Sequence, residues 1–518
     1  MMKKNLFLLF LLICTLMLFS CQTEHKHEWG EWKTTVAADC EHAGSRERAC
    51  SCGETEVEEI AATGHSFDNG KTVAATTARH GYTIRTCTAC AVVEKTDVVS
   101  PLGSVGLEYK VNDDKKTCTV TGIGTCTDTE LGIPDSIDGY EVTAIGEYAF
   151  RQANTLTYVW LGNNVKKLDF GAFDFCRQLQ EVVCGEHLET IGAAAFSTCL
   201  KLRNVEFSDS ITKIERDAFS HCNRLVTLDF GANLQTIEYS AFASCRSLIR
   251  VTLPKNLNQI GKEAFYNCNK LVEVINHSSM KIKNGSSSNG MVGNYALTVH
   301  DGESKIVEQG DFFFFEREPI SYLLAYKGTN TDLVLPENFK GQNYLVYDYA
   351  FVGQNGLTSV VIPQAAISFG TEAFQSCTKL EKVEISNLTA WCKTVFSTEG
   401  SNPLCYAEKL YLNGELLVNV SIPEGIETVQ PYAFVNCKDL QYVILPASVK
   451  SIRSNAFKGC SLNGDSYYAG SATEWNRVTM EKDALPTFCV TYYYSETKPE
   501  TAVSNYWRYV GGVPTRWE

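Results

Sequence analysis

The chain has 518 residues, of which 44% are hydrophobic, 20% charged and 11% aromatic. This composition is typical of a globular protein, and it excludes disordered, collagen-like and polytopic membrane chains. Acidic residues outnumber basic ones by 60 to 46, which gives a formal net charge of −14. Because neutralising phosphates needs clustered Lys and Arg, we do not expect an acidic chain without a basic stripe to bind nucleic acid.

The first 21 residues have the pattern of an export signal. A short basic start precedes an apolar run from Leu6 to Phe19, which is shorter than the roughly 20 residues needed to cross a bilayer. The run ends in LFSC, which resembles a bacterial lipobox whose cysteine is lipidated. We therefore expect residues 1–21 to be a lipoprotein signal peptide and Cys21 to carry the lipid. The alternative is an ordinary signal peptide. Either way the mature chain is exported, and the lipid would be its sole link to the membrane.

Residues 25–100 contain two units of about 37 residues, which align Gly44 with Gly81 and Cys50 with Cys87. Sets of four thiols and imidazoles suit tetrahedral zinc. A small module with few apolar residues also needs a metal ion or a covalent cross-link to stabilise its fold. The candidate metal ligands are His27, Cys40, Cys50 and Cys52 in the first unit and His65, Cys87 and Cys90 in the second, where His80 is an additional donor. In exported proteins disulfides commonly provide such a cross-link. Structural zinc, disulfides and neither of the two therefore all stay open, and no catalytic cofactor is expected.

A repeat of 23 residues follows, marked by the dipeptide Ala-Phe. Its phenylalanines are Phe150, Phe173, Phe196, Phe219, Phe242, Phe265, Phe351, Phe374, Phe434 and Phe457. An apolar residue stands five positions before each Phe, and the end of each unit alternates with period two, as a half-buried strand does. The central GxxAFxxC segment is compatible with a turn of helix. Because one unit cannot bury its own apolar face, the pattern predicts a repeat solenoid with a parallel sheet along one side.

Eight of the ten repeats carry a cysteine three positions after the Phe. These are Cys176, Cys199, Cys222, Cys245, Cys268, Cys377, Cys437 and Cys460. Stacked equivalents would lie about 5 Å apart with parallel Cβ directions, which is poor geometry for a disulfide. We therefore expect these cysteines to pack as small buried hydrophobes.

The pattern IGxxAFxxCxxLxxVxLPxxL resembles the BspA-like leucine-rich repeats of bacterial surface proteins. The resemblance covers residues 140–463, with a β-rich lead-in at 106–139 and an aromatic-rich C-terminal cap at 464–518. Two departures, at 276–343 and 386–430, are interpreted as enlarged coils; an insert with its own role at 276–343 is the alternative. The resemblance implies a leucine-rich-repeat fold with short helical turns. It also implies protein binding in adhesion to host matrix or to other cells.

Solenoids usually bind their partners through exposed sheet positions. The candidate partner-binding residues are Tyr158, Trp160, Glu181, Val183, Asn204 and Glu206. Tyr158, Trp160 and Val183 would form an exposed aromatic patch of the kind that dominates interface energy, unless the lead-in covers it. No GxSxG elbow, phosphate loop or HExxH motif occurs, so we do not expect an enzyme. The prediction is a lipid-anchored surface protein that binds extracellular or host proteins. The alternatives are a glycan-binding surface lipoprotein, using the aromatics of 464–518, and a purely structural envelope protein.

Overall fold

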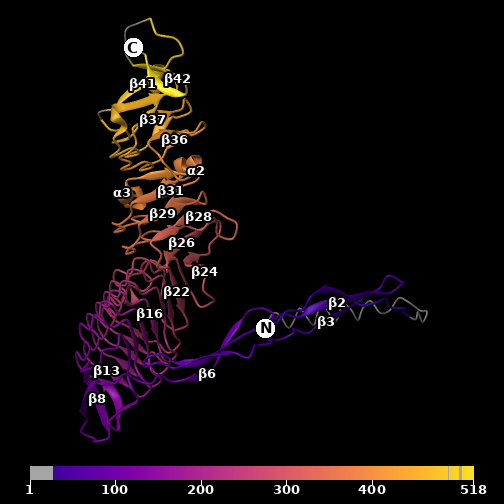
Figure 1. Cartoon of the computed structure of the whole chain (residues 1–518). Coiled ribbons are helices and arrows are strands. Elements are labelled where there is room, and N and C mark those ends of the chain that lie inside the picture. Colours follow the sequence, from indigo (N-terminus) through magenta and orange to yellow (C-terminus); the bar gives the residue numbers. More distant parts are fainter. Residues whose placement is uncertain (1–26, 488, 501–504, 518) are drawn as a thin grey trace. The chain divides into compact units, whose positions relative to one another are not determined.

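The computed structural model describes residues 27–487, 489–500 and 505–517. The predicted signal peptide and its Cys21 lie outside these residues. The chain divides into two compact units, Met1–Pro101 and Leu102–Glu518, and strands predominate in both (Figure 1). Within the described residues, none of the helices has the length and apolar character needed to cross a membrane.

The N-terminal unit contains two three-stranded antiparallel sheets, one for each predicted repeat. They consist of β1 (Lys33–Val36), β2 (Gly44–Ala49) and β3 (Thr55–Ile60), and of β4 (Lys71–Val73), β5 (Gly81–Thr86) and β6 (Val93–Val99). The middle strands begin at glycines because a Cβ at Gly44 or Gly81 would meet backbone atoms at 2.4 or 2.5 Å. Within residues 27–100 the buried hydrophobic side chains are those of Cys40, Cys50, Ala78 and Cys87. Three of these four are cysteines, so the unit has almost no conventional core.

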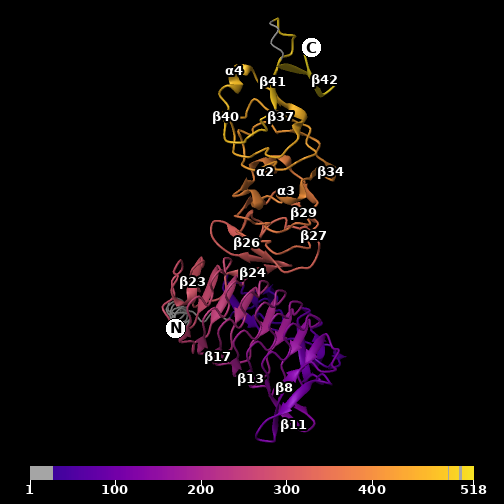
Figure 2. The ribbon, with the colours of Figure 1, turned by 90° about the vertical axis from the view of Figure 1, so that its left-hand side faces the viewer.

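The C-terminal unit is a β-solenoid of about 16 turns with a period near 23 residues, which confirms the predicted fold. Figure 2 shows the successive coils of its first part side by side. One side carries β9 (Glu130–Gly132), β12 (Tyr158–Trp160), β14 (Glu181–Val183) and β16 (Asn204–Glu206), followed by β18 (Thr227–Asp229), β20 (Arg250–Leu253), β22 (Glu273–Asn276) and β23 (Thr298–His300). They form two four-stranded parallel sheets, one from β9 to β16 and one from β18 to β23.

The other side of this first stack is a nine-stranded sheet. The lead-in starts it with the β7 (Glu108–Val111) and β8 (Thr117–Gly122) hairpin, and β10 (Ser136–Ile137) pairs with β11 (Tyr140–Ile145). Two-residue strands continue it: β13 (Lys167–Leu168), β15 (Thr190–Ile191), β17 (Lys213–Ile214), β19 (Thr236–Ile237) and β21 (Gln259–Ile260). The lead-in is thus hydrogen-bonded into both sheets of the stack.

Residues 276–343 hold the junction to a second stack. After β23, the antiparallel strands β24 (Ile306–Gln309), β25 (Phe312–Phe315) and β26 (Ser321–Tyr326) open a new sheet, which β28 (Tyr344–Val346), β30 (Ala366–Phe369) and β32 (Val395–Phe396) extend. A separate buried cluster joins Ile249 and Val272 of the first stack to Phe313, Phe315 and Leu324 of this hairpin. The two stacks have one apolar core each, and this small cluster lies between them.

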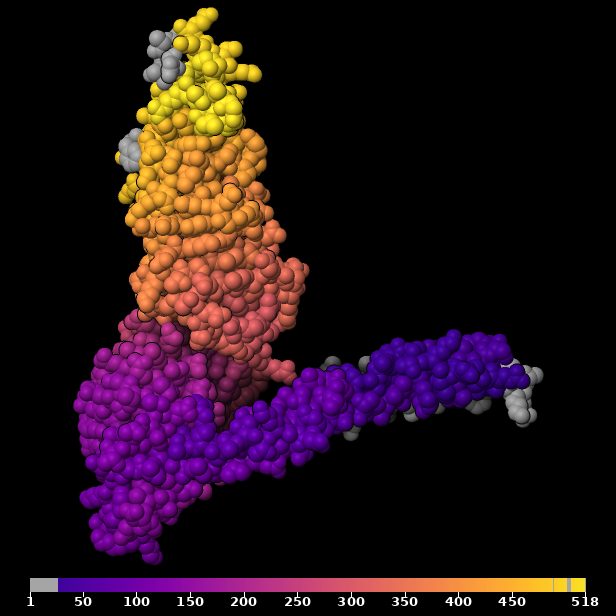
Figure 3. Space-filling model, viewed as in Figure 1, coloured from indigo at the N-terminus to yellow at the C-terminus, as the bar shows by residue number. Residues whose placement is uncertain are grey.

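The second stack continues to the C-terminus in the same manner. Its other strands are β27 (Asp332–Val334), β29 (Ser359–Ile362), β31 (Lys382–Ile385), β33 (Leu410–Leu412), β34 (Glu415–Leu416), β35 (Asn419–Ser421), β36 (Thr428–Val429), β37 (Tyr442–Leu445), β38 (Ser451–Ile452), β39 (Asp465–Tyr468), β40 (Thr479–Met480), β41 (Val490–Tyr494), β42 (Tyr506–Val510) and β43 (Val513–Arg516). Its coils form successive bands of surface, orange to yellow in Figure 3. The final β42–β43 pair is antiparallel.

The enlarged coil at 386–430 contains the helices α2 (Leu388–Lys393) and α3 (Leu404–Ala407). Asn387 caps α2 by accepting a hydrogen bond from the backbone of Ala390, and the indole of Trp391 donates to the carbonyl of Ala433, 3.0 Å away. A further short helix, α4 (Ala472–Trp475), and three 3₁₀ turns, Asn289–Met291, Glu399–Ser401 and Leu462–Gly464, complete the described helical elements. The insert in this coil therefore packs its aromatic residue onto the following repeat.

The repeated phenylalanines form a continuous column in the first stack, from Phe150 to Phe265, and two stacked pairs in the second, Phe351 with Phe374 and Phe434 with Phe457. The rings of Phe173 and Phe196 stack with centroids 5.3 Å apart and planes within 6°, and Phe219 and Phe242 repeat this at 5.2 Å and 2°. The GxxAFxxC segments turn without forming the predicted helical turn. Residues two positions before and after each Phe, such as Ala194 (φ 53°) and Thr198 (φ 59°), have left-handed backbone, which interrupts a right-handed helix.

Candidate functional site

The first candidate site is a cluster of four metal-ligand side chains in the N-terminal unit. The ligand atoms of Cys40, His65, Cys87 and Cys90 all lie within 4.8 Å of one another. The Sγ atoms of Cys40 and Cys87 are 3.8 Å apart, and the Sγ of Cys90 is 3.3 Å from Nδ1 of His65. Backbone N–H groups of Ala89 and Cys90 lower the pKa of the Cys87 thiol to about 5. The cluster can thus supply a thiolate at neutral pH.

A second cluster brings together His27, Cys50 and Cys52. The Sγ of Cys52 lies 3.4 Å from Nδ1 of His27. The repeat pattern groups Cys40 with these ligands of the first repeat, whereas the structure places Cys40 with the ligands of the second repeat. The backbone explains this placement: the turn of residues 39–42 is tied to Thr63, whose N–H donates to the carbonyl of Asp39. His80 belongs to neither cluster.

The two histidines have the same surroundings. Nε2 of His65 lies 3.5 Å from Oε1 of Glu41, and Nε2 of His27 lies 3.4 Å from Oε2 of Glu54. In each case the other ring nitrogen, Nδ1, faces a cysteine. A histidine placed between a thiol and a carboxylate is oriented as a metal ligand with an outer-shell carboxylate partner.

The predicted aromatic patch on the sheet is not exposed. Tyr158 retains 6% of its accessible surface and Trp160 retains 2%. β9, from the lead-in, pairs with β12 in parallel, so β12 is an inner strand, and all three of its residues are buried, on both faces of the sheet. The other predicted partner-binding positions differ in exposure: Glu181 and Val183 are half-buried, and Asn204 and Glu206 are exposed.

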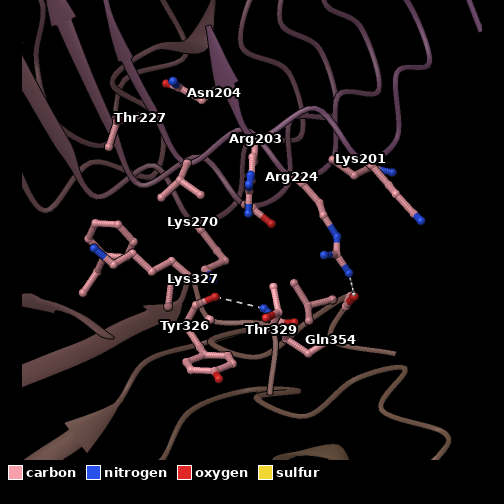
Figure 4. Close-up of a pocket in the computed structure, with 18 of the residues that line it drawn as sticks. Lys201, Arg203, Asn204, Arg224, Thr227, Lys270, Tyr326, Lys327, Thr329 and Gln354 are labelled. Atoms are coloured by element: carbon pink, nitrogen blue, oxygen red, sulfur yellow. Dashed lines mark hydrogen bonds between the residues drawn. The ribbon is translucent and has the colours of Figure 1, made fainter. Parts of the chain in front are cut away.

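A pocket of about 660 Å³ lies at the junction of the two stacks, a volume within the usual range for ligand sites. Its polar lining includes Glu181, Lys201, Arg203, Asn204, Arg224, Thr227 and Lys270 from the first stack and Tyr326, Lys327, Thr329 and Gln354 from the second. Figure 4 shows the two groups facing each other across the pocket. Two of the predicted partner-binding residues, Glu181 and Asn204, are therefore part of its wall.

The lining of the pocket is basic although the chain is acidic. Five of its residues are cationic and one, Glu181, is a carboxylate. Lys270 is 2% exposed and its Nζ donates to the neutral carbonyl oxygen of Ala350 at 3.0 Å. Burial lowers the pKa of Lys270 to about 7. An anion in the pocket would compensate this buried charge.

Arg224 and Arg203 extend the positive surface. Arg224 donates to the carbonyl of Gly353 at 3.0 Å, and burial together with the charge of Arg203 lowers its pKa. Arg203 forms an ion pair with Glu181 at 3.2 Å. The repeat pattern does not predict this basic pocket. A usable signal was present, because the fifth position after the repeat Phe is basic in three of four consecutive repeats, at Lys201, Arg224 and Lys270.

The aromatic residues of the C-terminal cap pack mainly inward. Tyr467, Tyr492 and Trp507 form one buried cluster with Ile444, and the indole of Trp507 donates to the carbonyl of Tyr468 at 2.9 Å. Tyr494 and Tyr509 stay exposed. Most of the aromatic side chains of the cap are therefore used in packing and are not free to stack on a sugar.

Comparison with known proteins identifies the repeat. A sequence profile described as the BspA type leucine rich repeat region matches in six copies, over residues 143–272, 327–403 and 406–467. These ranges together exceed half of the chain. The chain belongs to the BspA-type leucine-rich-repeat family. The unmatched residues 273–326 contain the junction between the stacks, where the BspA-type pattern is interrupted by antiparallel strands.

Several solved structures are similar to this chain. A leucine rich cell surface protein from Faecalibacterium prausnitzii is 22% identical, with 74% of this chain and 98% of that chain covered and a TM-score of 0.27. A leucine-rich repeat protein from Bacteroides ovatus is 17% identical, with 77% and 99% covered and a TM-score of 0.27. The pneumococcal vaccine antigen PcpA is 17% identical, with 82% and 94% covered and a TM-score of 0.27. No curated protein matches the chain.

Proposed function

We propose that this BspA-type protein is an exported, lipid-anchored surface protein that binds a partner protein and so mediates attachment to host matrix or to other cells. The leader ending in Cys21 supports export and anchoring. The family supports a binding role for the solenoid, since stacked repeats present extended surfaces to partners. No catalytic step is part of the proposal.

One observation supports the location of the binding site: the basic pocket includes sheet positions that are expected to contact a partner. The repeat pattern alone predicts Glu181 and Asn204 as partner-binding positions, and both line the pocket that Arg203, Arg224 and Lys270 make basic. On a chain of net charge −14 this is a local reversal of sign. The partner is therefore a protein that inserts an acidic side chain or acidic segment here, because complementary charge fixes the register of an interface.

The test is a binding measurement with the chain lacking its leader, residues 22–518, against immobilised matrix proteins and a glycan array. We expect saturable protein binding that an oligo-glutamate peptide inhibits and that weakens as salt is raised. The double variant Arg203→Gln/Arg224→Gln should lose at least about tenfold in affinity, as expected when a close charge pair is removed. Lys255→Gln, at an exposed lysine outside the pocket, is the matched control.

Three results would contradict the proposal. Binding to glycans alone would move the function to a carbohydrate ligand. Saturable protein binding that the double variant leaves unchanged would remove the pocket from the interface. The absence of any saturable ligand would favour a structural role in the envelope.

A further inference from the structure

We infer that Cys40, His65, Cys87 and Cys90 bind one Zn²⁺ ion, and that this ion joins the two N-terminal repeats. Cys40 comes from the first repeat and the other three ligands come from the second. The inference is independent of the proposed function, because it concerns a different unit of the chain.

Two of the six distances between ligand atoms match a tetrahedral zinc site, and all six are within 4.8 Å. Zinc lies about 2.3 Å from thiolate sulfur and about 2.0–2.1 Å from imidazole nitrogen. A regular tetrahedron with these arms separates two sulfurs by about 3.8 Å and a sulfur from a nitrogen by about 3.5 Å. The corresponding separations are 3.8 Å between the sulfurs of Cys40 and Cys87 and 3.3 Å between Cys90 and His65. A disulfide between Cys40 and Cys87 would instead require about 2.05 Å.

The surroundings of the site also suit zinc. His65 presents Nδ1 to the thiols and Nε2 to Glu41, which is the arrangement that fixes the tautomer of a zinc-bound histidine. Cys40 and Cys87 are buried, so the ion would replace the core that this unit lacks. Small domains of this size commonly obtain folding free energy from such a metal.

The repeat pattern gives a second, independent argument. Asp39 and Thr76 form the same turn in the two repeats: the N–H of Asp39 donates to His42 and the N–H of Thr76 donates to Arg79. The residue after Asp39 is Cys40, whereas the residue after Thr76 is Thr77. A cysteine thus occurs at this position only in the repeat that is followed by another His/Cys/Cys set. This is the distribution expected if the cysteine serves the following repeat.

The experiment uses residues 22–518, purified in reductant, loaded with Zn²⁺, passed over a chelator of moderate affinity and analysed for bound zinc per chain. We expect Cys40→Ser and Cys87→Ser each to remove one ion, and the double variant to remove the same single ion. Cys126→Ser, a half-buried cysteine outside the unit, should keep the wild-type zinc content. Cys40→His, which restores a zinc ligand, should keep the ion and shows that Cys40→Ser does not act by misfolding.

Cobalt provides a direct readout of the geometry. Co²⁺ in place of zinc should give the absorption of a tetrahedral thiolate site, weakened in Cys40→Ser. An unchanged zinc content in Cys40→Ser would overturn the inference. So would a disulfide between Cys40 and Cys87 in protein isolated without reductant from the cell that exports it.

Discussion

The Sγ of Cys199 donates a hydrogen bond to the backbone carbonyl of Phe173, 3.3 Å away in the preceding coil. Six further repeat cysteines make the same contact with the preceding repeat Phe: Cys176, Cys222, Cys245, Cys268, Cys377 and Cys460. The cysteine is therefore a small apolar side chain whose thiol adds a second hydrogen bond to a carbonyl that already accepts one from the backbone N–H three residues later, as Phe173 does from Cys176. Valine or alanine would lose this bond between coils.

Replacing one of these cysteines should weaken the stack. Cys222→Ala removes the donor to the Phe196 carbonyl and leaves a small cavity, so we expect a loss of about 1–3 kcal/mol in the free energy of unfolding. Urea denaturation followed by circular dichroism measures this. Cys126→Ala is the control, and an equal loss in the control would show that the inter-coil contact has no special weight.

Substitutions in the phenylalanine column should lower the free energy of unfolding more than substitutions of the repeat cysteines. Phe219 is fully buried and stacks on Phe196 and Phe242, so Phe219→Ala should cost about 3–5 kcal/mol. Tyr239→Ala, at a ring that is 47% exposed, should change stability by less than about 1 kcal/mol. Comparable losses in the two variants would contradict the assignment of the column as the core.

The burial of Lys270 should make the stability of the protein depend on pH. Burial lowers its pKa from 10.5 to about 7 in the folded chain, so between these values the unfolded chain binds more protons. Stability should therefore rise with pH across this window, by up to about 1.4 kcal/mol per pH unit. Lys270→Met should abolish this contribution and stabilise the protein at neutral and lower pH, whereas Lys255→Met should keep the slope. An identical slope in wild type and Lys270→Met would contradict the prediction.

The repeat thiols should be protected in the native protein. They are free and buried, and burial raises the pKa of Cys176 to about 12, which suppresses the reactive thiolate. Native alkylation should leave the eight repeat cysteines unmodified, and alkylation in denaturant should modify all eight without prior reduction. Mass spectrometry of the digested protein distinguishes this from a ladder of disulfides.

Lipid anchoring makes a separate prediction. If Cys21 carries the lipid, Cys21→Ser should move the exported protein from the membrane fraction to the soluble fraction of a bacterial host. A variant that stays membrane-associated would show that another element attaches the chain.

The 23-residue period predicted the solenoid and its buried ladders because each repeat packs mainly on its neighbours. The period does not predict contacts between segments that are far apart in the sequence. Lys270 and Ala350 meet across 80 residues, and nothing in the local pattern places them together. The assignment of Cys40 failed for a related reason, since a ligand can serve a neighbouring repeat. For Trp160 the pattern left two alternatives, an exposed aromatic patch or cover by the lead-in, and the residue is buried; strand alternation predicts which face a residue takes but not what covers that face.

The interruption of the ring column between Phe265 and Phe351 has a mechanical consequence. In a chain of stacked coils, a load applied along the stack passes through every coil-to-coil interface in series, so the interface with the fewest interlocking groups yields first. At the junction the aromatic column is replaced by a small apolar cluster and by the bonds of Arg224 to Gly353 and Lys270 to Ala350. If the chain is held at one end and bound at the other, as proposed, tension along the stack would act on the wall of the basic pocket, because the pocket lies at this junction.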